Sequence, residues 1–148
     1  MTNQETARAM KSHHAQMAKE LNDLVLAIST SEASWESARN AVASYLREQV
    51  LPHAAAEEST VYRVGAKEES LKALIDSMLF EHTIIKGVAE RIASSNGRDE
   101  SLVLAAEAAK LFEVHAEKEN RFIIDFLEPR NDVDLGAVLG DMHQLLAH

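Results

Sequence analysis

The spacing of apolar residues constrains this chain more than any other feature of its sequence. In the first segment, steps of four and three residues alternate through Met10, His14, Met17, Leu21, Leu24 and Ile28. This period is typical of one buried face of an α-helix. It returns in the later segments, and alternation with a period of two never persists for more than a few residues. We therefore predict an all-α protein.

Cap and turn residues divide the first half of the chain into two helices. Thr2 followed by Glu5 has the spacing of a capping box, which predicts the start of the first helix. The Ser- and Thr-rich stretch Ser29–Ser34 is expected to end that helix. Pro52 lies inside the second helix and predicts a kink or local irregularity, because proline lacks a backbone donor and clashes with the preceding turn. Gly65 marks the turn that follows.

The second half of the chain divides in the same way. A third helix is predicted from about Ser70 to a stop at the Asn-Gly pair ending in Gly97, since both residue types tolerate the left-handed cap conformation. Asp99 is expected to cap the fourth helix and Pro129 to close it. A short fifth helix is predicted from Asp134. Four helices of about 20–28 residues with short loops predict an up-down-up-down four-helix bundle.

The length of 148 residues fits one domain. Residues 1–128 are predicted to form the bundle, and residues 129–148 a helical tail that packs on the bundle or lies at an interface. The inward faces are expected to include Gln49 in the second helix and Phe122 in the fourth.

Composition excludes several classes of function. The chain has no Cys, which excludes a disulfide scaffold, a thiolate metal site and a thiol nucleophile. A formal charge of −9 argues against nucleic-acid or anionic-membrane partners, because both select patches of Lys and Arg. No apolar run approaches the roughly 18–20 residues of a membrane span, and the N-terminus lacks a signal pattern. We expect a soluble, cytoplasmic protein.

Four of the seven His residues lie on the predicted inward faces, and two of these are followed four residues later by Glu. The six residues are His14, His53, Glu57, His82, His115 and Glu119. Their order repeats, because a single His precedes a His-x-x-x-Glu pair in each half of the chain. Residues four apart share a helix face, so each pair points an imidazole and a carboxylate toward one volume. Two packed helical hairpins would bring all six together.

A metal site explains this pattern better than hydrogen bonding alone. Six such groups buried without partners would cost roughly several kcal/mol each. Imidazole and carboxylate ligands without sulfur suit iron, manganese or zinc, and six of them serve a carboxylate-bridged pair better than one octahedral ion. The alternative is a metal-free bundle in which these groups only form hydrogen bonds. His13, His143 and His148 are expected to be solvent-facing or terminal, with His13 as a fallback ligand.

At these residues the sequence resembles the hemerythrin-like family, the HHE cation-binding domain. The resemblance covers about residues 10 to 128 and includes local strings such as Leu51-Pro52-His53 and Glu81-His82. It implies a four-helix bundle with a non-haem di-iron centre and a bridging oxo or hydroxo group, in which manganese or zinc are substitutes. By this resemblance Glu57 and Glu119 bridge the irons. One iron is bound by His14 and His53 and the other by His82 and His115.

The chain departs from the oxygen-carrying members of that family in one respect. Those proteins use a fifth His, four residues from another on the third helix, whereas the positions four away from His82 are Met78 and Lys86. One coordination position is therefore expected to be open. Glu58, Glu81 and Tyr45 are the candidates to fill it. Core packing is favoured for Tyr45, and for Glu58 a supporting or rim role, since it is offset by about 100° from Glu57.

The resemblance implies a protein that binds or reacts with O2, nitric oxide or peroxide, and catalase-like turnover of peroxide stays open. The alternative is an iron- or oxygen-responsive interaction module, with Leu135–Leu146 as a partner surface and no catalytic turnover. A monomer or a homodimer is expected. The outer ring nitrogens of the His ligands should donate to nearby acceptors, and the candidates are Glu58, Glu81, Asp76 and Asp125. The ferritin-like alternative needs Glu-x-x-His motifs, and the chain has none.

Overall fold

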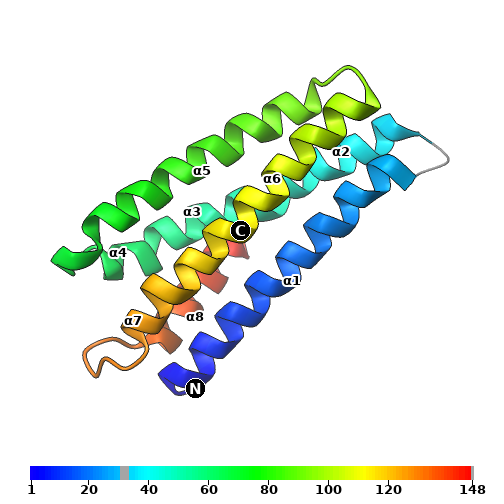
Figure 1. Ribbon diagram of the computed structural model, residues 1–148. Helices are drawn as coiled ribbons and strands as arrows, with labels where there is room; N and C mark the ends of the chain where they lie inside the picture. The colour runs from blue at the N-terminus through cyan, green and yellow to red at the C-terminus, as the bar shows by residue number, and fades with distance from the viewer. Residues whose placement is uncertain (31–33, 148) are drawn as a thin grey trace.

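The computed structural model describes residues 1–30 and 34–147, and it confirms the all-α prediction. The helices before residue 128 form four long rods, each made of one helix or of several consecutive helices. Neighbouring rods run in alternating directions (Figure 1). The first is α1 (Asn3–Thr30) and the third is α5 (Lys72–Ala93). The second and fourth rods are each built from several segments. Helix α1 packs against the second and fourth rods, and so does α5. None of the helices described is both long and apolar enough to cross a membrane.

The second rod contains the irregularity that Pro52 predicts. It consists of α2 (Trp35–Tyr45), a π-helical turn over Leu46–Val50, α3 (Leu51–Ser59) and α4 (Val61–Gly65). In the π turn the Leu51 N–H bonds to the Leu46 carbonyl, five residues back. The extra residue rotates the following helix, so Val50 is buried and Gln49 is exposed. The prediction that Gln49 faces inward is therefore wrong.

The fourth rod contains a second π turn. It consists of α6 (Arg98–Glu119), the π turn Asn120–Ile124 and α7 (Asp125–Leu127). Here too one extra residue shifts the buried face, so Ile123 and Ile124 are buried and Phe122 is 53% exposed. The prediction that Phe122 faces the core is wrong for the same reason as that for Gln49.

Most of the predicted helix ends are found. The Thr2 N–H donates to Glu5, and the Glu5 N–H donates to the Thr2 hydroxyl, which is the expected capping box. Of the predicted break at Ser29–Ser34, residues 31–33 lie outside the described residues. Asp99 is not a cap: it lies in the first turn of α6, whose N-cap is Gly97. Gly97 has φ 156°, a backbone conformation that residues with a Cβ rarely adopt.

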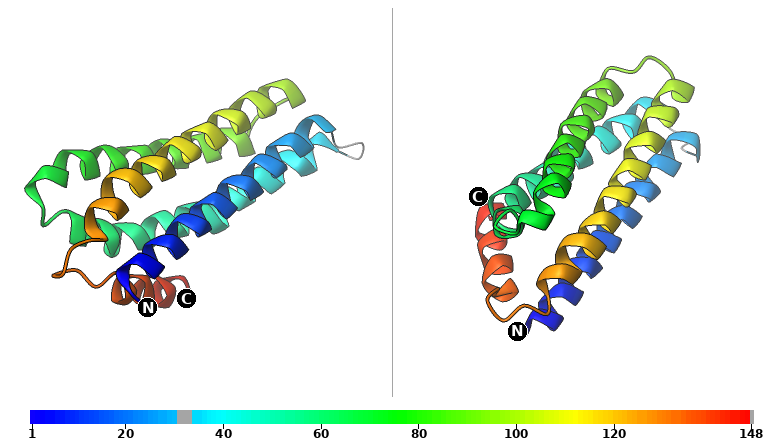
Figure 2. Two further views of the ribbon diagram at one scale, coloured as in Figure 1. Left: turned by 60° about the horizontal axis from the view of Figure 1, so that its bottom comes forward. Right: turned by 60° about the vertical axis from the view of Figure 1, so that its left-hand side comes forward.

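The predicted fifth helix is α8 (Leu135–Leu146), and the side chain of Asp134 caps it. Helix α8 packs against α1 and α3, along the side of the bundle in the half that holds the N-terminus (Figure 2). The Asn3 side chain holds the connecting segment: its amide donates to three carbonyls, including that of Val133 at 2.8 Å, and its oxygen accepts the Leu135 N–H. The division of the chain after residue 128 stays a prediction.

The apolar core consists of two clusters with a polar layer between them. One cluster contains Met17, Ile85 and Phe112, and the other contains Met10 and Met78 together with the buried face of α8. The six His and Glu residues of the sequence pattern lie between these clusters, and each is at most 6% exposed. The fold therefore buries six ionisable groups at one level of the bundle, where they must satisfy one another or a ligand.

Candidate metal centre

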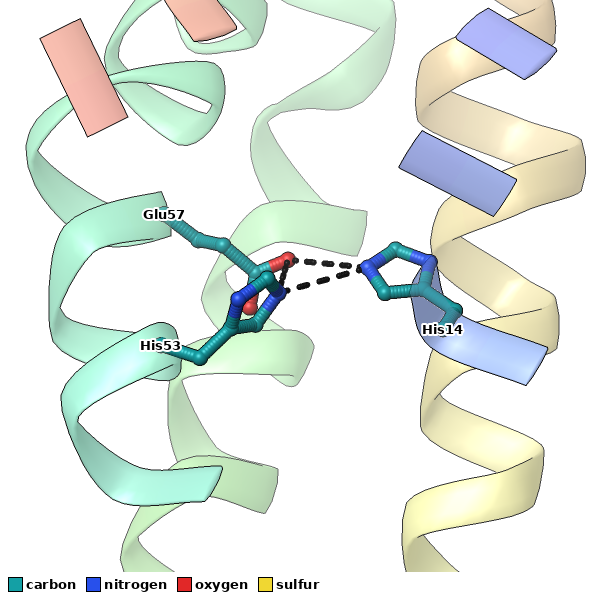
Figure 3. A group of neighbouring side chains, drawn as sticks. All are labelled: His14, His53 and Glu57. Atoms are coloured by element: carbon teal, nitrogen blue, oxygen red, sulfur yellow. Dashed lines mark hydrogen bonds and ion pairs between the residues drawn. The ribbon is translucent and has the colours of Figure 1, made fainter. Parts of the chain in front are cut away.

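The structure brings together all six residues that the sequence pattern singled out. Helix α1 contributes His14, α3 contributes His53 and Glu57, α5 contributes His82, and α6 the remaining pair. Each rod thus supplies at least one group to the same layer. Figure 3 shows His14 from α1 facing His53 and Glu57 from α3.

One half of the layer is formed by His14, His53 and Glu57. The Nε2 atoms of the two imidazoles are 3.4 Å apart. The Glu57 Oε2 atom lies 3.4 Å from Nε2 of His53 and 3.6 Å from Nε2 of His14. One atom from each residue lies within 4.8 Å of the others, so these three groups could hold one cation.

The other half is formed by His82 and His115, whose Nε2 atoms are 3.0 Å apart. These two imidazoles form a second triad with Glu57, again with one atom of each residue within 4.8 Å of the others. Glu57 therefore belongs to both halves. A carboxylate shared in this way has the position of a bridge between two cations.

Glu119 also reaches both halves. Its Oε1 atom lies 3.3 Å from Nε2 of His14, and its Oε2 atom lies 3.8 Å from Nε2 of His115. Its two oxygens thus point to different sides of the layer. The arrangement offers two imidazoles on each side and two carboxylates between them.

Three of the imidazoles are oriented by acceptors at their outer nitrogens. The Nδ1 of His82 donates to Glu58 at 2.8 Å, and that of His115 donates to Glu81 at 2.9 Å. The Nδ1 of His14 donates to the side-chain oxygen of Asn120 at 2.7 Å. These contacts place a proton on Nδ1, so that each imidazole in its neutral form has its Nε2 lone pair facing the centre, as in metal-bound His.

Two buried atoms have no hydrogen-bond partner among the described residues: the Glu57 Oε2 atom and the Nδ1 of His53. The carboxylate oxygen lies between two imidazoles, yet it accepts a hydrogen bond from neither. An unpartnered buried carboxylate oxygen is costly in an apolar core, and a cation at this point would satisfy it. The donor set therefore fits a pair of metal ions.

Sequence reasoning missed Tyr62, which the structure places in the same layer. Its hydroxyl donates to Oε2 of Glu119 at 2.9 Å and lies 3.2 Å from Nε2 of His115 and 3.3 Å from Nε2 of His82. Helical spacing from Glu57 points to Val61 as the next inward residue. The helix breaks at Thr60, with φ −126° and ψ −86°, and both Val61 and Tyr62 are buried. The only feature of the sequence that could have identified Tyr62 is its position five residues after Glu57.

The other candidates have different roles. Tyr45 is directed away from the centre, and its hydroxyl donates to Glu20 at 2.8 Å. Glu58 and Glu81 accept from imidazoles at their outer edge, which fits the supporting role expected of Glu58. Asp76 has no such contact among the described residues, and Asp125 pairs with Lys11 instead.

The remaining His residues follow expectation where the structure describes them. His13 and His143 are exposed, and His148 lies outside the described residues. The His13 ring lies beside that of His53, with ring centroids 5.2 Å apart.

The two buried carboxyl groups, Glu57 and Glu119, have pKa values shifted in opposite directions. Burial and the neighbouring charge of Glu57 raise the pKa of Glu119 to about 8. Burial opposes ionisation of Glu57 as well, but the contact with Glu119 and the neighbouring His53 hold its pKa well below the usual range. Burial disfavours the charged form of His14, and the two carboxylates outweigh this and raise its pKa. Without a metal, the side chains of Glu119 and His14 are therefore protonated at neutral pH.

Burial lowers the pKa of His115, which keeps that imidazole neutral. Burial and the nearby Glu119 charge raise the pKa of the Tyr62 hydroxyl. Glu81 is partly buried, yet its contacts with Lys118 and His115 lower its pKa, so it remains an anionic acceptor for His115.

A comparison with protein-family models matches residues 5–127 to the model described as the hemerythrin HHE cation binding domain. The matched range contains all six residues of the layer and ends before α8. Searches of curated proteins and of solved structures gave no significant match.

Proposed function

The chain belongs to the hemerythrin HHE cation-binding domain family, and on that basis we propose that it holds a pair of iron ions that bind or react with O2, nitric oxide or peroxide. The observation that carries the proposal is the pair of buried triads that share Glu57. His14 and His53 would bind one ion, and His82 and His115 the other. Glu57 and Glu119 would bridge the two.

Tyr62 is the residue that we propose for the coordination position left open by the missing fifth His. Its oxygen lies 3.3 Å from Nε2 of His82 and 3.2 Å from Nε2 of His115, the nitrogens that face the centre. The oxygens of Glu58 and Glu81 contact only the outer Nδ1 nitrogens. A phenolate is a hard oxygen donor that suits ferric iron. Tyr62 would then close the His82–His115 side, and a small molecule would approach from the His14–His53 side.

An iron pair of this kind supplies reversible electron transfer to a small oxygen- or nitrogen-containing molecule. The chain's own residues supply the surroundings for it. The apolar clusters on either side of the layer exclude bulk water, and Glu58, Glu81 and Asn120 fix the ring orientations of three imidazoles. Glu119 and His14 must give up their protons when a metal binds, because bound ligands are deprotonated.

The test is metal analysis with an optical spectrum of protein purified aerobically from iron-supplemented cells. We expect two irons per chain and ligand-to-iron absorption in the near ultraviolet. Titration of the reduced protein with O2, nitric oxide and peroxide then identifies the reactive partner. Protein that carries zinc or no metal, with no absorption band, would overturn the iron proposal.

The second candidate is an iron- or oxygen-responsive module without turnover. It is favoured by the position of the layer, which joins all four rods, so that metal loss would loosen the whole bundle. The two proposals differ in peroxide consumption by the iron-loaded protein. Sustained oxygen evolution supports a catalyst, whereas a spectral change that stops after one equivalent supports a sensor.

A further inference from the structure

A cavity of about 270 Å³ lies beside the His14–His53 half of the metal layer. His14, His53, Glu57 and Glu119 form its polar end. Apolar side chains form most of the remaining wall, among them Met10 and Val61 from the bundle. His82 and His115 do not line it, and the Tyr62 hydroxyl occupies their side of the layer. A small molecule in this cavity would therefore meet only the His14–His53 side.

Helix α8 roofs the cavity. Leu139, Met142, His143 and Leu146 line it, and the spacing of these four residues places them on one face of the helix. His143 and His13 of α1 are exposed and lie where the cavity approaches solvent. Because α8 lies beyond the family match at residues 5–127, the roof is a feature of this chain rather than of the matched domain.

The size of the cavity exceeds what a diatomic gas or a peroxide needs. One water occupies about 30 Å³, and a dry cavity of about 150 Å³ holds benzene. A cavity of about 270 Å³ thus accommodates a molecule with roughly six to ten non-hydrogen atoms, even with one metal ion at its polar end. Met10 and Met142 are flexible side chains that adapt to such an occupant.

The charge of the layer selects the head group of that molecule. Glu57 and Glu119 supply two negative charges and a Tyr62 phenolate would supply a third, whereas two divalent ions supply four positive ones. The surplus positive charge favours an anion at the polar end, and the apolar wall favours a hydrocarbon chain behind it. Building on the metal pair proposed above, we infer that this cavity binds a short-chain monocarboxylate, with its carboxylate at the metal pair and its tail under α8.

The experiment is a calorimetric titration of the iron-loaded protein with acetate, butanoate, hexanoate and decanoate. Each methylene buried in the cavity is expected to tighten binding about four-fold. We therefore expect hexanoate to bind at least about ten-fold more tightly than acetate, with no further gain for decanoate once the cavity is full. Equal affinities for acetate and hexanoate, or a gain that continues undiminished to decanoate, would overturn the inference.

Leu139→Trp fills the cavity from the roof, and Leu145→Trp places the same side chain on α8 outside it, where Leu145 is 50% exposed. The first variant should lose the preference for hexanoate but keep its affinity for acetate and its iron, and the second should behave as the parent protein. Retention of the preference in Leu139→Trp contradicts the assignment. Absence of iron in the parent protein would overturn the metal pair itself. Two irons per chain without chain-length preference would overturn only the cavity ligand.

Discussion

At the scale of single residues, the centre depends on contacts behind the six ionisable groups as much as on those groups. Glu58, Glu81 and Asn120 each accept a hydrogen bond from an imidazole Nδ1 and so decide which nitrogen faces the centre. Glu81 is held in place by Lys118 at 2.7 Å. Among the described residues His53 has no such acceptor, and its ring lies beside that of the exposed His13. Both imidazoles of the His82–His115 half therefore have an orienting acceptor, and only one of the His14–His53 half does.

Glu81→Ala is expected to weaken metal binding by about 10- to 100-fold, because His115 loses the acceptor that orients its ring. A competition titration with a chelator measures the change. Glu90→Ala removes an exposed carboxylate from the same helix and serves as the control. Equal affinities for the two variants would show that Glu81 does not position His115.

Tyr62→Phe tests the hydroxyl that the structure places among the imidazoles. If Tyr62 binds ferric iron, the oxidised protein has a visible phenolate-to-iron absorption band that this variant loses while it keeps two irons per chain. The metal-free variant should also unfold about 1–3 kcal/mol more easily, since the buried Oε2 of Glu119 loses its donor.

The matched control is Tyr45→Phe, which removes the other tyrosine hydroxyl of the chain from a half-buried position beside Glu20. It should leave the visible band unchanged. A band that survives in Tyr62→Phe would show that the hydroxyl is not a ligand.

At the scale of elements, the irregular segments lie next to the functional residues. The π turn Leu46–Val50 ends three residues before His53, and the π turn Asn120–Ile124 follows directly after Glu119 and contains Asn120. Each inserts one residue and so changes which face of the following segment is buried. The break at Thr60 places Tyr62 in the layer. Three departures from regular helix therefore complete the centre.

The attachment of α8 is a second property at this scale, and it depends on Asn3. Asn3→Ala is expected to destabilise the protein by about 1–3 kcal/mol, because four backbone groups in the connection to α8 lose their partner. Urea unfolding measures the effect, and Gln4→Ala, at an exposed neighbouring position, should change stability little. Equal stabilities would show that water replaces Asn3 without cost.

At the scale of the whole molecule, the polar layer separates two apolar clusters that would otherwise form one core. The layer joins residues from all four rods, so a ligand bound there stabilises the folded state against the unfolded one. The same layer without a ligand retains the unpartnered Glu57 Oε2 atom in an apolar environment. Stability and metal content should therefore be linked.

Removal of the metal is expected to lower the midpoint of thermal unfolding by at least about 5–10 °C. This value follows from the stabilisation of the folded state by bound metal, which is about 2.7 kcal/mol per site at a free metal concentration one hundred times the dissociation constant. Circular dichroism of the metal-free and reconstituted protein measures the shift. Identical midpoints and helix content would argue against a module that loosens on metal loss, and would limit the layer to a local role.

The sequence by itself determined the helices and the six groups of the layer, since both follow from local periodicity. Apolar residues at steps of three and four define each inward face, and His14, His53, His82 and His115 lie on those faces with Glu57 and Glu119. Only the tertiary structure decided the burial of Val50 in place of Gln49, the outward position of Phe122, the contact of Tyr62 and the roof formed by α8. Pro52 predicted an irregularity in the second rod, but a π turn or a break is stabilised by packing against other rods, so the spacing within one segment does not show which residues it buries. Contacts such as His14 with Asn120 join residues far apart in the chain and form only when the rods pack.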